Sequence, residues 1–224
     1  MYRSKSVVTA LVSVLLGGAA LALAGFALAS NTPHQKSLQC VPDATMANSC
    51  NLSMNTYGDS LAGQHGPTGG AHPDWVSYSN QNLSVPANTT VNITINQYDS
   101  GGALNNAFFD QVMGTVGGTA TFNGVALTHV DPNNIGHTFT LRGIPGSGSH
   151  IFVSVPLPAD SNGGVVKIGA GEYTAPNVIK FSFKTGSKGV YQWNCEFPCG
   201  GSREGQFGQA MSTFGYMAGT LTVN

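Results

Sequence analysis

Two cysteines and a methionine near the end of the chain could bind a metal ion. Cys195 ends the aromatic run "GVYQWNC", Cys199 follows four positions later, and Met217 stands just before the closing run "AGTLTVN". Thiolate and thioether sulfur are soft ligands that suit copper. Such a site commonly contains imidazole as well, yet no histidine follows His150. The imidazole must therefore come from an earlier part of the chain.

His137 is the first candidate for that imidazole. In "NIGHTFTLRG" it shares one face of a predicted strand with Phe139 and Leu141. A single histidine on such a face is more often structural than a ligand. An imidazole, a thiolate and a weak thioether together, however, form the ligand set of copper electron-transfer sites. The sequence therefore predicts a metal site that includes His137, Cys195 and Met217.

The elements that would position these residues are predicted to be β-strands. Val91, Ile93 and Ile95 alternate with polar residues, which is the period of a half-buried strand. Six further runs read as strands separated by Gly, Pro and Asn: "TATFNGVAL", "HTFTLRGI", "HIFVSVPL", "NVIKFSFK", "GVYQWNC" and "AGTLTVN". Many short strands with almost no helical periodicity predict an all-β sandwich or small barrel.

Residues 82–224 resemble the cupredoxins, or blue copper proteins. "SVPANTTVNITINQYD" is similar to their early strand pair, "GHTFTL" to the segment with the first histidine ligand, "GVYQWNCEFP" to the strand ending in the cysteine ligand, and "GYMAGTLTV" to the axial methionine and last strand. The resemblance implies a Greek-key β-sandwich with His137, Cys195 and Met217 as copper ligands. The long segment before His137 is similar to the insertion of rusticyanin and sulfocyanin.

The chain departs from the family after Cys195. Cupredoxins commonly carry a second histidine in a Cys-x-x-Pro-Gly-His pattern, whereas "CEFPCG" has Cys199 in place of the glycine and Gly200 in place of the histidine. Arg203 cannot replace the imidazole, because a guanidinium is a permanent cation without an acceptor. The second imidazole is therefore missing from this part of the sequence.

Three alternatives for the site stay open. In the first, one copper is held by the three predicted ligands and a fourth donor from Cys199, His65, His72 or His150. In the second, both cysteines bridge two coppers, as in cytochrome c oxidase subunit II, although Arg203 occupies the position of a histidine ligand of that family. In the third, Cys195 and Cys199 form a disulfide on a metal-free cupredoxin fold.

The N-terminal part of the chain predicts export. Residues 7–29 contain no charged residue and follow Arg3 and Lys5, so they form either a signal peptide or a membrane-anchoring helix. As a helix they would reach about 35 Å, enough to cross a bilayer core. Residues 30–80 are expected to be an irregular leader with a Cys40–Cys50 disulfide, and residues 81–224 the cupredoxin-like domain.

Composition narrows the function. Charged residues make up 8 % of the chain and the net charge is −1, which argues against nucleic-acid binding. Neither a Gly-x-Ser-x-Gly elbow nor a metal-hydrolase histidine pair is present. We expect a non-enzymatic copper protein, extracytoplasmic and membrane-anchored or secreted, that exchanges single electrons with a redox partner such as a terminal oxidase. The competing class is a metal-free structural or binding module.

Overall fold

The computed structural model describes residues 37–58, 75–103, 106–159, 162–168, 171–199, 210 and 216–224. All of these residues belong to one compact unit, Gln35–Asn224. The predicted N-terminal hydrophobic helix lies outside the described residues, so whether it is a signal peptide or an anchor stays a prediction. Within the described ranges, no helix has the length and apolar character needed to cross a membrane.

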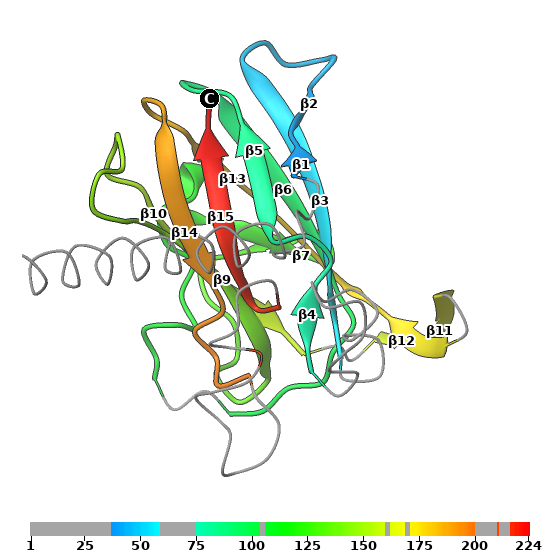
Figure 1. Ribbon diagram of the computed structural model, residues 1–224. Helices are drawn as coiled ribbons and strands as arrows, with labels where there is room; N and C mark the ends of the chain where they lie inside the picture. Colours follow the sequence, from blue (N-terminus) through cyan, green and yellow to red (C-terminus); the bar gives the residue numbers. More distant parts are fainter. Residues whose placement is uncertain are drawn as a thin grey trace, which may run out of the picture. The chain divides into compact units, whose positions relative to one another are not determined.

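Two β-sheets make up most of the described structure (Figure 1). The first sheet has the strand order β1 (Leu38–Gln39), β5 (Asn82–Val85), β15 (Ala218–Val223), β14 (Gly189–Asn194), β9 (Ile135–Gly143) and β10 (Phe152–Pro158). The second has the order β2 (Val41–Pro42), β3 (Ser49–Tyr57), β6 (Thr90–Gln97), β13 (Asn177–Lys184), β7 (Ala120–Phe122) and β8 (Val125–Leu127), with β4 (Ser77–Tyr78) paired to β3.

Smaller elements complete the described secondary structure. β11 (Asn162–Ile168) and β12 (Gly171–Ala175) form a separate antiparallel pair that the sequence pattern did not predict. A short 3-10 turn, η1 (Val116–Gly118), precedes β7. The Greek-key connectivity implied by the family resemblance stays a prediction.

The predicted all-β sandwich is confirmed, and every predicted strand run contains an observed strand. β6 and β13 alternate strictly, with Ile93, Ile95, Phe181 and Phe183 buried and their neighbours more exposed. Alternating side chains point to opposite faces of a sheet, so these residues form the inner face of the second sheet. They belong to one hydrophobic core with Trp193 and other residues of the first sheet.

The expectation of an irregular leader before residue 81 is wrong for β1 to β4. β3 runs in register beside β6 over eight residue pairs, and Leu52 and Met54 belong to the core. Its sequence, "SCNLSMNTY", has alternating burial, but serine and asparagine mask the strand pattern. Tertiary pairing with β6 overrides the weak intrinsic strand preference of these residues.

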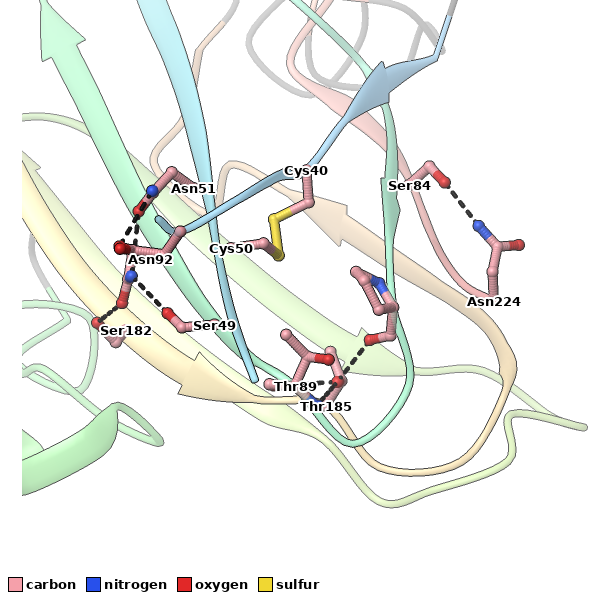
Figure 2. The surroundings of a disulfide bond; sticks show 12 residues. Cys40, Ser49, Cys50, Asn51, Ser84, Thr89, Asn92, Ser182, Thr185 and Asn224 are labelled. Carbon is pink, nitrogen blue, oxygen red and sulfur yellow. Dashed lines mark hydrogen bonds between the residues drawn. A yellow bond between two sulfur atoms is a disulfide. The ribbon is translucent and has the colours of Figure 1, made fainter. Parts of the chain in front are cut away.

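The predicted Cys40–Cys50 disulfide is confirmed (Figure 2). Cys40 lies where the chain passes from β1 of the first sheet to β2 of the second, and its N–H donates to the carbonyl of Ser84 in β5. Cys50 lies in β3 of the second sheet. The disulfide therefore links β3 to the segment between β1 and β2, where the chain passes from the first sheet to the second.

Candidate metal centre

Three strand ends of the first sheet meet at the candidate site. β9 and β15 both pair antiparallel with β14, so the starts of β9 and β15 lie at the end of β14. His137 is the third residue of β9, Cys195 directly follows β14, and Met217 directly precedes β15. This topology explains why residues separated by up to eighty positions in the sequence come together.

The end of β14 gives Cys195 a fixed place. β14 ends at Asn194, opposite Thr140, so the buried Thr138 has no partner residue in β14. The Thr138 N–H donates to Sγ of Cys195 at 3.3 Å, and the Tyr78 hydroxyl donates to the Thr138 carbonyl at 2.9 Å. The thiol and the phenol thus satisfy backbone groups that the sheet leaves open.

The turn after Cys195 brings Cys199 next to Cys195 and His137. Its N–H donates to the Phe197 carbonyl at 2.7 Å. Sγ of Cys199 lies 3.1 Å from Sγ of Cys195 and 3.0 Å from Nδ1 of His137, while Sγ of Cys195 lies 3.9 Å from the same nitrogen. Both thiols are free. The structure therefore places Cys199, one of the fourth donors predicted from the sequence, in the cluster.

The three side chains are withdrawn from solvent. His137 is 2 %, Cys195 1 % and Cys199 5 % exposed, and their ligand atoms all lie within 4.8 Å of one another. Trp193 packs edge-on against Tyr78 and stacks on Phe139, forming an aromatic wall directly before Cys195. A hollow of about 270 Å³, lined by Phe197 and others, reaches Cys199 from the surface.

Asp99 completes the surroundings of the imidazole. Its Oδ2 lies 3.0 Å from Nε2 of His137, on the ring atom that does not face the sulfurs. The predicted metal ligands do not include this residue. The available signal was an acidic residue two positions after the predicted strand "VNITINQ", and only the sandwich brings the end of that strand next to β9.

Burial and hydrogen bonds shift the pKa values of the cluster in opposite directions. Burial disfavours the imidazolium, but hydrogen bonds and charges from Asp99 and Cys195 outweigh it and raise the pKa of His137 from 6.5 to about 9. Burial also disfavours a thiolate, yet hydrogen bonds from Cys199 and His137, with the imidazolium charge, lower the pKa of Cys195 from 9.0 to about 5. Burial and then the Cys195 thiolate raise the pKa of Cys199.

The negative charge belongs on Cys195 rather than on Cys199. Cys195 accepts the N–H of Thr138, which stabilises a thiolate. Cys199 experiences the additional negative charge of Asp99. Hydrogen bonding and charge repulsion therefore agree on Cys195 as the first thiol to ionise, although Cys199 lies closer to the ring nitrogen.

The predicted ligands differ in how far the structure brings them together. Met217 is 1 % exposed, and its carbonyl accepts the N–H of Cys195 at 2.9 Å, so its backbone adjoins the cluster. Ligation by its thioether stays a prediction.

His150 is exposed. It lies near the end of β9 that is opposite to His137, because Arg142 pairs with Phe152 while His137 pairs with Leu157. His150 is therefore not the fourth donor.

Several other predicted participants fall outside the described residues. They are His65 and His72, which the sequence offered as fourth donors, and Gly200 and Arg203, which stand where related proteins have a histidine. Their relation to the site stays a prediction.

The donor set fits copper better than it fits a catalytic nucleophile. Two sulfurs and one imidazole nitrogen suit a soft metal such as Cu(I), and a carboxylate on the second ring nitrogen is a common partner of a metal-binding histidine. Cys199, His137 and Asp99 also follow the order of nucleophile, base and carboxylate. However, the raised pKa and deep burial of Cys199 disfavour attack by its thiolate at neutral pH.

No protein-family model and no curated protein sequence matches the chain. Among solved structures, auracyanin B is similar over 84 % of this chain and 96 % of its own, with 16 % identity and a TM-score of 0.32. Rusticyanin from Thiobacillus ferrooxidans is similar over 91 % of this chain and 94 % of its own, with 12 % identity and a TM-score of 0.36. A multicopper oxidase is similar over 82 % of this chain and 46 % of its own, with 13 % identity and a TM-score of 0.29.

At the level of the family, the structural matches over most of this chain are cupredoxins.

Proposed function

We propose that the chain is a copper-binding, non-enzymatic carrier of single electrons. Cys195, Cys199 and His137 hold the metal, and Met217 supplies a weak fourth ligand. The observation that carries this proposal is the buried contact of two free thiols with Nδ1 of the imidazole. Copper, when bound, supplies the one-electron chemistry by alternating between Cu(I) and Cu(II).

The chain's own residues keep the donors in place. The Thr138 N–H fixes the Cys195 sulfur, and Asp99 fixes the imidazole. Trp193 and Tyr78, both fully buried, exclude water from the inner side of the cluster. A buried, prearranged donor set needs little rearrangement between two oxidation states, which is the property that an electron carrier requires.

We further propose that the protein works outside the cytoplasm, held at a membrane by its N-terminal segment, with a respiratory redox protein such as a terminal oxidase as partner. The uncharged segment at residues 7–29 supports the anchor. The Cys40–Cys50 disulfide supports an oxidising compartment, because structural disulfides are rare in the cytosol. With so few charged residues, docking to the partner would depend little on salt.

Copper loading of the full chain in mild detergent tests the proposal. After selective reduction of the free thiols, we expect one copper per chain and an intense visible thiolate-to-copper band. Cys195→Ser and Cys199→Ser should each lose the band. Met217→Leu should keep the metal but shift the spectrum and reduction potential, whereas Met54→Leu, a matched change of a buried core methionine, should leave both unchanged.

Other results would select the alternatives. Two coppers per chain that need both cysteines would establish a binuclear centre, which the 3.1 Å separation of the two sulfurs also accommodates. A protein isolated with no free thiol and no copper would indicate a Cys195–Cys199 disulfide on a structural or binding module. Purification with tightly bound zinc that copper cannot replace would contradict electron transfer.

A further inference from the structure

The imidazole of His137 is held at both nitrogens. Nδ1 faces the sulfurs of Cys199 and Cys195, and Nε2 lies 3.0 Å from Oδ2 of Asp99. An imidazole can flip its ring or exchange its tautomer, and the partner of one nitrogen determines which nitrogen is free to bind a metal. The partner on Nε2 therefore determines whether Nδ1 is available to the cluster.

Asp99 is itself held so that one oxygen stays on the histidine. Its second oxygen, Oδ1, accepts the Ser100 N–H at 2.7 Å. Its own N–H donates to Oε1 of Gln97 at 3.2 Å, and the Gln97 amide donates back to the Asp99 carbonyl at 3.4 Å. Gln97 is fully buried and accepts a hydrogen bond from the Thr56 hydroxyl. A continuous set of contacts thus fixes the carboxylate from β3 and β6.

The segments around Asp99 are closely packed and joined by backbone hydrogen bonds. Gly102 exchanges two backbone hydrogen bonds with Ile135, at 2.9 and 3.0 Å, which ties the segment after Asp99 to the start of β9. A Cβ at Gly136 would lie 2.0 Å from Nε2 of Gln97, and a Cβ at Gly58 would lie 2.8 Å from Oδ1 of Asp99. These glycines leave space only for the side chains that hold the carboxylate.

We propose that Asp99 is a positioning residue of the metal centre: it keeps a proton on Nε2 of His137, turns Nδ1 toward Cys195 and Cys199, and places a fixed negative charge beside the metal. This inference rests on the proposed copper function. A nearby carboxylate favours the more highly charged Cu(II), so it lowers the reduction potential of the centre. Partners of this kind typically change metal affinity by about 10- to 100-fold when mutated.

Two variants separate the two roles of Asp99. Asp99→Asn keeps an oxygen that can accept the Nε2–H but removes the charge, so we expect the reduction potential to rise while the spectrum changes little. Asp99→Ala removes both the acceptor and the charge, so we expect Cu(I) affinity to fall by about 10- to 100-fold. Asp131→Asn, the same change at an exposed aspartate in the turn before β9, is the matched control and should match the wild type.

A readout that needs no metal keeps this inference distinct from the proposed function. In the metal-free, thiol-reduced full chain, the Nε2 proton of His137 should give a downfield, exchange-protected NMR signal that Asp99→Ala abolishes and Asp131→Asn preserves. If the wild type bound no copper, the copper proposal would fail, yet this signal would still show whether Asp99 holds the ring. Thermal melting of each variant identifies any loss of fold.

Two results would overturn the inference. The first is an Asp99→Ala protein that keeps the protected Nε2 proton signal, because the ring would then be held by another group. The second is a combined result: copper-loaded Asp99→Asn has the reduction potential of the wild type, and Asp99→Ala has the Cu(I) affinity of the wild type. Asp99 would then be a structural residue without influence on the metal.

Discussion

Sγ of Cys199 lies 3.0 Å from Nδ1 of His137. Sixty-two positions separate these residues in the sequence, so only the folded sandwich brings them together. Their contact places a sulfur beside the one imidazole of the cluster. The cluster offers one imidazole nitrogen and two sulfurs, a donor set that suits a soft metal.

The first prediction concerns the ionisation of the two free thiols. In the metal-free, reduced protein we expect one thiolate per chain at pH 7, because the pKa of Cys195 is lowered to about 5 while that of Cys199 is raised. Ultraviolet absorbance of thiolate during a pH titration measures this directly. Cys195→Ser should abolish the acidic step, and a wild-type titration with both thiols near their ordinary pKa would contradict the site's electrostatics.

The same groups make the stability of the metal-free protein depend on pH. The raised pKa of His137 stabilises the fold below its unfolded value of 6.5 and loses this effect as pH rises through about 9. The lowered pKa of Cys195 stabilises above 9.0 and loses this effect as pH falls through about 5. Between about pH 6.5 and 9 the two effects on the free energy of unfolding oppose each other and cancel. The free energy of unfolding should therefore fall only as the pH is lowered from about 6.5 to 5, where the effect of Cys195 acts alone. Urea unfolding at several pH values, with Cys195→Ser as the comparison, measures the step.

Gly219 should not tolerate a side chain. A Cβ there would lie 1.8 Å from the backbone oxygen of Gln81, which accepts hydrogen bonds from the Thr220 N–H and the Trp193 indole. Gly219→Ala should therefore lower the free energy of unfolding by about 1–3 kcal/mol or more. Gly143→Ala is the control, because its Cβ would meet nothing closer than 3.6 Å. Equal stability of the two variants in chemical denaturation would show that this close approach is relaxed in solution.

Tyr78→Phe should destabilise the fold next to the metal site. The Tyr78 hydroxyl is fully buried and donates to the Thr138 carbonyl beyond the end of β14. Removing it leaves a buried carbonyl without this donor, which costs about 1–3 kcal/mol. Tyr98→Phe, at a partly exposed tyrosine that stacks on Tyr57, should change stability much less. A Tyr78→Phe protein as stable as Tyr98→Phe would contradict the role given to this hydrogen bond.

Removal of the disulfide should weaken the fold without affecting the metal site. The Cys40→Ala/Cys50→Ala double variant should lose about 2–4 kcal/mol of unfolding free energy, since the bond closes a ten-residue separation between the two sheets (Figure 2). Cys50 pairs with Val91, whereas Thr56 at the site end of β3 pairs with Gln97, so the disulfide lies about 20 Å along the strand from the site. A changed copper stoichiometry in this variant would show that the two regions are coupled.

The sequence could predict the features that are encoded locally. Strict alternation in β6 and β13 has one physical cause, the opposite orientation of successive side chains, and it can be read without a partner strand. The alternating aromatic residues of the run "GVYQWNC", which ends at Cys195, can be read as a strand for the same reason. The Cys40–Cys50 pairing was also predictable, because the two cysteines are only ten positions apart in a chain that is predicted to be exported.

Features that depend on pairing between distant segments could not be predicted in this way. β3 carries serine and asparagine at its exposed positions, and only its neighbour β6 makes it a core strand.

The all-β sandwich and the candidate ligands His137, Cys195, Met217 and Cys199 can be predicted from the sequence, because periodicity and residue type are local properties. Three contacts depend instead on how the chain folds: Cys199 joins the cluster, His150 lies away from it, and Asp99 lies at the second ring nitrogen of His137. The reason is physical: each of these contacts is made across strand ends from different parts of the chain, and sheet order and register, rather than sequence spacing, set such distances.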